Sequence, residues 1–223
     1  MGCVVAGEVN DSGHEPAGLD ELLEADPEWQ RIHKLVQRRA GQHSPFIIKR
    51  ISKVRRCQKF QQYEAEAAKL GKSTELFHGT SLSSATRIAR EGFKLPKHSG
   101  LYGPGLYFAD DPNKSADYAP EASWLPFVKR WVANGFWDAV FNSDEGQMLL
   151  CDVYLGATKR CVFTVSDFDP ATGLRSGWFR SLLGLGDYDS VTAPGWILSR
   201  TEYVVYREQQ AVPRFLIEYE LRK

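Results

Sequence analysis

Three short segments, far apart in the chain, constrain the fold more than any other feature. They are residues 76–80 (Leu-Phe-His-Gly-Thr), 102–109 (Tyr-Gly-Pro-Gly-Leu-Tyr-Phe-Ala) and 201–206 (Thr-Glu-Tyr-Val-Val-Tyr). Each has the apolar content of a buried strand and also carries polar or aromatic groups. Strands so distant in sequence meet by pairing in a sheet, so we expect the three segments to converge on one cleft.

The N-terminal part of the chain has the signals of a helix. Asp26 is followed by Pro27 and Glu28, which gives a capping carboxylate, a proline in the first turn and an acidic first turn. Gly41 is expected to end this helix. Its buried face is predicted from four apolar residues at helical spacing: Trp29, Ile32, Leu35 and Val36.

The rest of the chain is richer in strands. Residues 46–54 have a strand pattern, and apolar residues recur at helical spacing over 57–70. Residues 148–155 are apolar on both faces, as in a central strand, and residues 215–221 alternate. Short helices are expected at residues 84–90 and after 111–112. Helices first and many strands later predict an α+β domain with a mixed or antiparallel sheet.

Length and charge limit the function. A chain of 223 residues with 43% hydrophobic content can bury one sizeable core. We therefore expect a flexible arm over 1–25 and one domain over 26–223, with a helix–strand–helix part at 26–72 and a core at 73–223. The formal net charge is zero, so a broad attraction to nucleic acid is not expected.

The four cysteines are scattered and form no Cys-x-x-Cys pair, so we expect neither a disulfide framework nor a zinc site. This usage predicts an intracellular protein, nuclear or cytoplasmic. Gly2 and Cys3 could accept two lipid chains, but Ala6 stands where Ser or Thr is favoured. We expect a membrane partner only if these two residues are lipidated.

His78 and Gly79 suggest a ligand site at a strand end. A glycine lets a ligand approach the backbone closely, and the N–H and C=O of one residue match the acceptor and donor of a carboxamide. Ser115 and Tyr118 are three residues apart on an expected helical turn, so hydroxyl and ring share a face. These groups suit a flat aromatic amide.

Glu202 suggests the chemistry. It precedes an apolar strand run, so its charge acts in a reduced dielectric. Cleavage of a glycosidic bond develops positive charge on the sugar ring, which a nearby carboxylate stabilises. The inventory as a whole suits a site that grips an aromatic amide and a sugar and breaks the bond between them.

The motifs resemble the catalytic domain of the poly(ADP-ribose) polymerase family. The shared pattern is His-Gly-Thr at 78–80, Tyr-Gly-x-Gly-x-Tyr-Phe-Ala at 102–109, Ser-x-x-Tyr at 115–118 and Glu-Tyr-x-x-Tyr at 202–206. Residues 209–217 are similar to the final strand of its tankyrase-like members. The resemblance covers about residues 75–223, and more faintly 27–70. It implies an ADP-ribosyltransferase-type fold, in which two packed, mostly antiparallel sheets form an NAD cleft and helices lie at the N-terminal side.

The resemblance also implies roles for individual residues. His78, Tyr107 and Glu202 would be the catalytic set, with His78 on the adenosine-side ribose of NAD and Glu202 on the reacting ribose. The other implied contacts concern nicotinamide: Gly79 through its backbone, Ser115 through its hydroxyl, Tyr107 and Tyr118 by stacking. Lys114 matches a family lysine near this pocket, and a solvated lysine is the alternative.

The function implied is NAD-dependent transfer of ADP-ribose to protein acceptors with release of nicotinamide. NAD is a co-substrate, no metal is expected, and nucleic acid is not required. Single transfer and elongation to poly(ADP-ribose) both stay open, because Glu202 keeps elongation chemically available. The alternatives are an NAD glycohydrolase, in which water attacks, and an inactive module that binds NAD or ADP-ribose.

Two segments have a plain and a functional interpretation. The basic run at residues 49–59 is either a solvated face or a contact for nucleic acid or an acidic acceptor. The aromatic-rich residues 123–141 are either an amphipathic helix packed on the domain or a lid or partner-docking surface.

Overall fold

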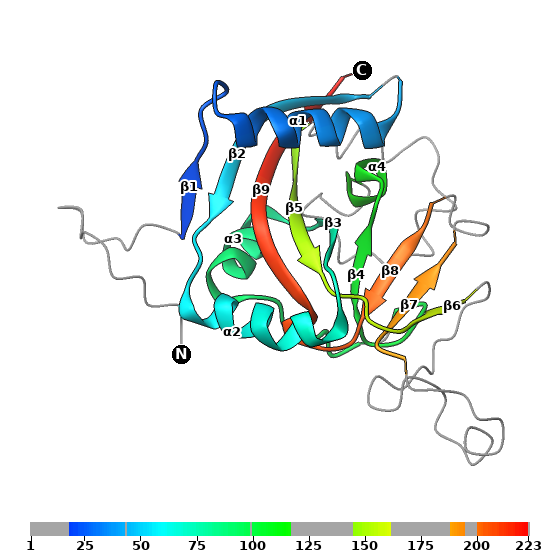
Figure 1. Cartoon of the computed structure of the whole chain (residues 1–223). Coiled ribbons are helices and arrows are strands. Elements are labelled where there is room, and N and C mark those ends of the chain that lie inside the picture. Colours follow the sequence, from blue (N-terminus) through cyan, green and yellow to red (C-terminus); the bar gives the residue numbers. More distant parts are fainter. Residues whose placement is uncertain are drawn as a thin grey trace, which may run out of the picture.

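A single hydrogen-bonded sheet organises the protein in the computed structural model, which describes residues 18–42, 44–98, 100–116, 145–161, 188–194 and 200–222 (Figure 1). Its strands, within these ranges, are β1 (Leu19–Glu21), β2 (Phe46–Val54), β3 (Thr74–Gly79), β4 (Leu106–Ala109), β5 (Glu145–Val153), β6 (Thr158–Arg160), β7 (Ser190–Ala193), β8 (Glu202–Val205) and β9 (Ala211–Leu221). The spatial order is β1-β2-β9-β5-β3-β4-β8-β7-β6. All neighbouring pairs are antiparallel except β6 with β7.

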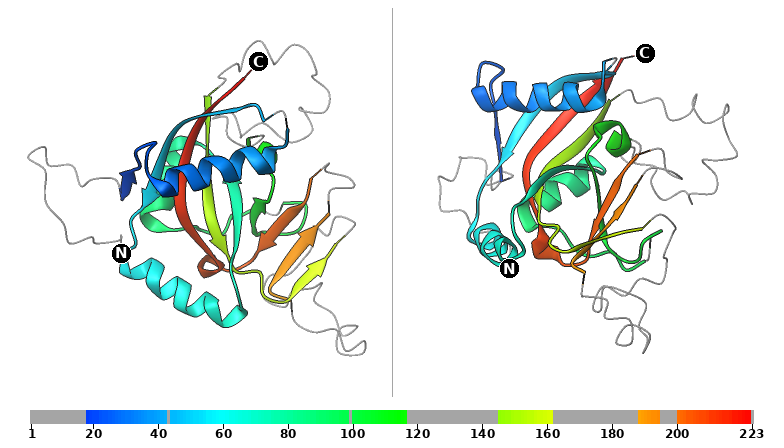
Figure 2. Two further views of the ribbon diagram at one scale, coloured as in Figure 1. Left: turned by 45° about the horizontal axis from the view of Figure 1, so that its top comes forward. Right: turned by 45° about the vertical axis from the view of Figure 1, so that its right-hand side comes forward.

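The sheet has two halves that meet at one thin joint. The β3–β4 pair is joined through a single register pair, Phe77 with Ala109, whereas β3 and β5 pair over six positions from Thr74 to Gly79. Figure 2 shows β8, β7 and β6 running at an angle to β9 and β5. The two sheets expected from the family are thus continuous through this joint, and the predicted α+β class is confirmed.

The helices cover the faces of the larger half. They are α1 (Pro27–Ala40), α2 (Gln58–Ala67), α3 (Leu82–Glu91) and the short α4 (Pro112–Ala116), with 3-10 turns at Ala68–Leu70 and Glu208–Gln210. Figure 1 shows α1 crossing β2, β9 and β5 on one side of the sheet and α3 on the other. Helices α1 and α3 each form an apolar cluster with the strands beneath them. The strands between them are therefore buried on both faces.

The predicted start and end of α1 are confirmed. Asp26 caps the helix, because its carboxylate accepts a hydrogen bond from the Glu28 N–H at 2.7 Å, and such a cap contributes about 1 kcal/mol. Gly41 follows the last helical residue with φ +93°, a conformation that glycine adopts without strain. The four apolar residues predicted to face inward are buried.

The predicted strands at 46–54 and in the apolar run from 148 match β2 and β5. In β5, six of the nine residues are buried, and Met148, Leu149 and Cys151 have no exposed surface. Continuous burial explains why this segment lacks the alternation of a half-exposed strand. The expected helical segment after residue 57 is α2.

Part of the expected N-terminal arm belongs to the sheet. Leu19–Glu21 forms β1, which pairs antiparallel with Ser52 to Val54 at the end of β2. The pairing is stabilised by long-range backbone bonds, which the local sequence does not reveal. Three of the predicted features lie outside the described residues: residues 1–17 of the arm, with the Gly2–Cys3 pair, Tyr118, and residues 123–141.

Two expectations about composition can be compared with the structure. Of the described cysteines, Cys151 and Cys161 carry free thiols, while Cys57 is disulfide-bonded, which the scattered cysteines of the sequence did not predict. None of the helices in the described ranges has the length and apolar character needed to cross a bilayer.

The basic run at 49–59 is neutralised within the fold. Its side chains have these partners: Lys49 with Glu220, Arg50 with Glu21 and Glu218, Lys53 with Glu28, Arg55 with Asp20, Arg56 with Glu64, and Lys59 with the Glu91 carbonyl. Neighbouring strands and helices therefore supply a carboxylate or carbonyl for each cation. This pairing favours the solvated face over a nucleic-acid contact.

Candidate active site

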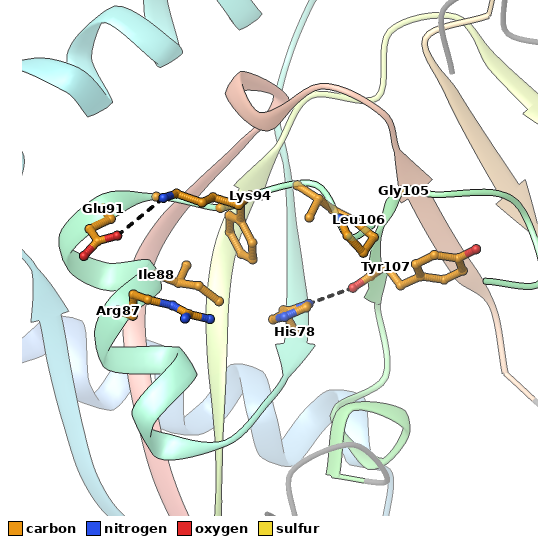
Figure 3. Close-up of a pocket in the computed structure, with 11 residues that line it drawn as sticks. His78, Arg87, Ile88, Glu91, Lys94, Gly105, Leu106 and Tyr107 are labelled. Carbon is orange, nitrogen blue, oxygen red and sulfur yellow. Dashed lines mark hydrogen bonds and ion pairs between the residues drawn. The ribbon is translucent and has the colours of Figure 1, made fainter. Parts of the chain in front are cut away.

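His78 stands at the end of β3, beside a cavity of about 310 Å³ (Figure 3). Its Nδ1 lies 2.9 Å from the backbone oxygen of Tyr107 on β4. Because a carbonyl only accepts, Nδ1 carries the proton and donates. The ring also packs edge-on against Phe93, with centroids 5.1 Å apart, and against Phe108. Strand, hydrogen bond and ring contacts together fix the orientation of this imidazole.

The environment of His78 also sets its charge. Burial lowers the pKa of this imidazole below its ordinary value of 6.5, and the bond to the Tyr107 carbonyl offsets only part of that effect. The ring is therefore neutral at pH 7, with Nδ1 as donor and Nε2 as acceptor. A neutral Nε2 can accept a hydrogen bond from a ligand hydroxyl.

Charged side chains surround the same cavity. Arg87 and Lys94 line it together with Glu91, and the Lys94 ammonium lies 3.8 Å from the Glu91 carboxylate. Figure 3 shows Arg87 extending from α3 toward His78. Arg87 forms no ion pair with another described residue. A cation of this kind beside a neutral imidazole suits an anionic ligand that also carries hydroxyl groups.

Gly79 is required by the packing of α4. A Cβ at this position would overlap the carbonyl oxygen of Ser115, and the carbonyl carbon of Ser115 would be only 2.6 Å away. The prediction from sequence was that the missing side chain admits a ligand. In the structure it admits the backbone of α4, which brings Ser115, itself 2% exposed, directly beside the end of β3.

Glu202 begins β8 and is 4% exposed. It lies between Ala109 of β4 and Ala193 of β7, whose small side chains leave room around the carboxylate. The Lys114 ammonium of α4 lies 3.1 Å from its Oε1. The solvated alternative for Lys114 is thus excluded, since its side chain is only 10% exposed. A buried carboxylate and a buried ammonium here balance each other.

Tyr107 shares a face of the β4–β8 pair with Glu202. Residues 107 and 109 are two positions apart on β4 and therefore lie on the same face of the sheet. Their partners on β8 are Val204 and Glu202, which lie on that face too. Its hydroxyl donates to the Gly103 carbonyl at 2.8 Å and accepts from the Tyr102 N–H at 2.9 Å. Figure 3 shows the ring extending away from His78. The Tyr107 carbonyl therefore contacts His78 on β3, whereas the Tyr107 ring lies on the face of the β4–β8 pair that also carries Glu202.

The structure brings most of the predicted residues together in two neighbouring groups. His78 and the Tyr107 backbone form one, and Gly79, Ser115, Lys114 and Glu202 the other, joined through the adjacent positions 78 and 79. Tyr118 lies outside the described residues. The described residues contain no group of three or more His, Cys, Asp or Glu that could hold a metal ion.

Some residues at the site were not predicted from sequence. Burial, reinforced by the charge of Glu202, raises the pKa of the Tyr102 hydroxyl. Asp111 and Arg200 form an ion pair beside α4, with Nε 2.5 Å from Oδ2. The Asp111-Pro112 helix start marked one partner, but an arginine in an irregular segment has no sequence signal. Arg87 resembled any solvated residue of a helix.

Comparisons with known proteins identify the family of this chain. The family model of the poly(ADP-ribose) polymerase catalytic domain matches residues 26–169, a range that includes His78, Tyr107 and Ser115 and ends before Glu202. Over 212 residues the chain is 24% identical to mouse "Protein mono-ADP-ribosyltransferase PARP3", covering 91% of this chain and 39% of that protein.

Two further relatives have similar descriptions. Human "Protein mono-ADP-ribosyltransferase PARP14" is 32% identical over 107 residues, which is 44% of this chain and 6% of that protein. Rice "Poly [ADP-ribose] polymerase 2-B" is 26% identical over 199 residues, 77% of this chain and 28% of that protein. The chain thus spans less than half the length of each of these three relatives. Because the matched family model covers more than half of the chain, this protein belongs to the poly(ADP-ribose) polymerase catalytic domain family.

Proposed function

We propose that this protein is an ADP-ribosyltransferase that uses NAD as donor and modifies protein acceptors. The observation that carries this proposal is the buried Lys114–Glu202 pair, 3.1 Å apart, next to the packed contact between Gly79 and Ser115. A buried carboxylate near a strand end whose backbone suits a carboxamide supports this proposal. The printed names of the relatives, a mono-ADP-ribosyltransferase and a poly [ADP-ribose] polymerase, support the same activity.

Each of the two groups of residues in the site would bind a different part of NAD. Nicotinamide would lie at Gly79 and Ser115, stacked on the rings of Tyr107 and Tyr118. The adenosine-side ribose would donate a hydroxyl hydrogen bond to Nε2 of the neutral His78. The diphosphate carries negative charge, which Arg87 and Lys94 at the cavity would balance.

Glu202 would act on the reacting ribose. When the bond between ribose C1′ and the nicotinamide nitrogen breaks, its electron pair leaves with nicotinamide, and positive charge develops on the sugar ring. A carboxylate bonded to the neighbouring 2′-hydroxyl stabilises that charge, and the low exposure of Glu202 strengthens its effect. The acceptor then adds at C1′ and loses a proton. No group in this sequence of events needs oxidation or reduction.

The identity of the acceptor determines the product. A protein nucleophile gives single transfer, a second ADP-ribose gives polymer, and water gives hydrolysis. Glu202 supports elongation because it can also orient an incoming ribose hydroxyl. The relatives include proteins named for single transfer and proteins named as polymerases.

The test is incubation of the purified protein with adenine-labelled NAD, followed by denaturing electrophoresis, with Glu202→Gln in parallel. We expect label on protein, with a fall of about 10²-fold or more in the variant. A sharp band means single transfer and a high-mass smear means polymer. Release of nicotinamide without label would identify a glycohydrolase. Neither label nor nicotinamide would refute the enzyme and leave an NAD- or ADP-ribose-binding module.

The compartment belongs to the same proposal. The free thiols of Cys151 and Cys161 fit a reducing interior, nuclear or cytoplasmic, whereas the disulfide at Cys57 favours an oxidising one. We infer a reducing interior, in which the disulfide of Cys57 would be reduced to a thiol. Alkylation of protein from its native cells under denaturing, non-reducing conditions tests this, because an unlabelled Cys57 would refute it.

A further inference from the structure

Three side-chain contacts tie the segment around α4 to the segment that enters β8. They are Asp110 with Tyr203 at 3.2 Å, Asp111 with Arg200 at 2.5 Å, and Lys114 with Glu202 at 3.1 Å. Burial and the neighbouring Asp110 charge raise the pKa of Tyr203 to about 12, so its hydroxyl stays protonated and donates. Two stretches of only a few residues are therefore joined at three successive points.

Asp111 is the centre of this arrangement. Its Oδ1 accepts hydrogen bonds from the backbone N–H and the side-chain amide of Asn113 at 2.9 and 2.8 Å, and its Oδ2 holds Arg200. The same Asn113 amide donates to the Ala40 carbonyl at the end of α1 at 3.2 Å. One carboxylate thus fixes the start of α4 and also holds the chain two residues before Glu202.

The Arg200–Asp111 ion pair is more exposed than the Lys114–Glu202 ion pair. The side chains of Arg200 and Asp111 are 36% and 24% exposed, against 10% and 5% for Lys114 and Glu202. A partly exposed pair contributes little to stability. Its main effect here is geometric, because it restricts where the chain can enter β8.

We propose that Asp111 and Arg200 are positioning residues, whose ion pair fixes the entrance of β8 against α4 and so sets the place of the Glu202 carboxylate. This inference rests on the proposed function, in which Glu202 must meet the reacting ribose while Ser115 holds nicotinamide. A displacement of about 1 Å in such a site can cost about 10²-fold in rate.

The contacts that would survive loss of Arg200 make the proposal specific. Without it, α4 keeps its bond from Asn113 to Ala40 and its packing of Ser115 on Gly79. The nicotinamide-holding side would stay in place, and only the entrance of β8 would gain freedom. Binding of the donor and its turnover should therefore respond differently.

The test is Arg200→Gln in the full chain. We expect kcat for nicotinamide release to fall by about 10-fold or more while KM for NAD changes by less than about twofold. Benzamide, which has the carboxamide and flat ring of nicotinamide, should bind with an unchanged Kd by calorimetry. Arg200→Lys keeps the charge beside Asp111 and should recover most of the lost kcat.

Arg207→Gln is the matched control. Arg207 pairs with Asp189 just beyond the other end of β8, and these side chains are 48% and 25% exposed, close to the values of the Arg200 pair. Its loss should leave kcat unchanged, and both variants should melt at similar temperatures.

Several outcomes would overturn the inference. These are an unchanged kcat in Arg200→Gln, an equal fall in Arg207→Gln, or a loss of benzamide binding and melting temperature together with kcat. Wild-type protein that releases no nicotinamide would overturn the proposed function and this inference with it. An active wild type with a fully active Arg200→Gln would overturn the inference alone.

Discussion

The ammonium of Lys114 lies 3.1 Å from the carboxylate of Glu202, and the two side chains are 10% and 5% exposed. The pair joins α4 to β8 across the candidate site. Charges buried this deeply are tolerated because each compensates the other, and removal of one partner is far more costly than removal of both. This relationship gives the first prediction.

Lys114→Met should lower the free energy of unfolding by about 3–5 kcal/mol, because it leaves the Glu202 charge in a poorly solvated site. The double variant Lys114→Met/Glu202→Gln should lose clearly less than the sum of the two single variants. Urea unfolding at pH 7 measures both effects. Lys69→Met is the control, since its pair with Glu66 is exposed and should contribute less than about 1 kcal/mol. Additive single effects would contradict the coupling.

Gly79→Ala should displace α4, because the new Cβ would overlap the Ser115 carbonyl. We expect benzamide binding and NAD turnover to be lost together, and the unfolding free energy to fall by about 1–3 kcal/mol. Gly18→Ala is the matched control, since a Cβ there has nothing within 4 Å. Calorimetry with benzamide and urea unfolding of both variants test this. Normal binding by Gly79→Ala would mean that α4 is not held against β3.

The affinity for NAD should weaken at acid pH through His78. The pKa of this imidazole is lowered from its ordinary 6.5, so the folded protein holds it neutral at pH 7, and it gains a proton only below pH 6.5. Protonation removes the acceptor at Nε2, so KM for NAD should be flat from pH 7 to 8 and rise only as pH falls below 6.5. The free energy of unfolding should also fall as pH drops below 6.5, because the unfolded chain binds this proton at a higher pH than the folded protein does.

His78→Gln is the control for this pH dependence. Its amide can replace both the donor and the acceptor without titrating, so its KM should be higher overall and independent of pH over the same range. Steady-state kinetics between pH 5.5 and 8 in buffers of constant ionic strength compare the two proteins. An acid rise of equal size in His78→Gln would assign the effect to another group.

Arg87 should contribute to donor binding through charge. It lines the cavity beside His78 and makes no ion pair with another described residue. A charge-assisted bond to phosphate is worth about 1.5–3 kcal/mol, so Arg87→Gln should raise KM for NAD about tenfold or more and reduce its dependence on salt. Arg90→Gln is the control, since Arg90 lies on the same helix, does not line the cavity and pairs with Glu91. Equal KM values in both variants would contradict this role.

Local signals in the sequence accounted for individual elements. Asp26, Pro27 and Gly41 predicted both ends of α1, because capping and the left-handed conformation of glycine depend on only a few neighbouring residues. The strand β2 and the doubly buried β5 followed from hydrophobic pattern alone. The strand β1 did not, because three residues at a sheet edge are selected by their partner strand.

The motifs that carry His78, Tyr107, Ser115 and Glu202, in this order along the chain, were enough to predict membership of the family. Their roles stay predictions. What only the tertiary structure decided is how they meet: that Gly79 is small to admit Ser115, that the Tyr107 ring and backbone serve opposite sides of β4, and that Asp111 reaches Arg200. These contacts join segments separated by tens of residues. They arise from the pairing of β4 with β8 and the packing of α4, which no local pattern encodes.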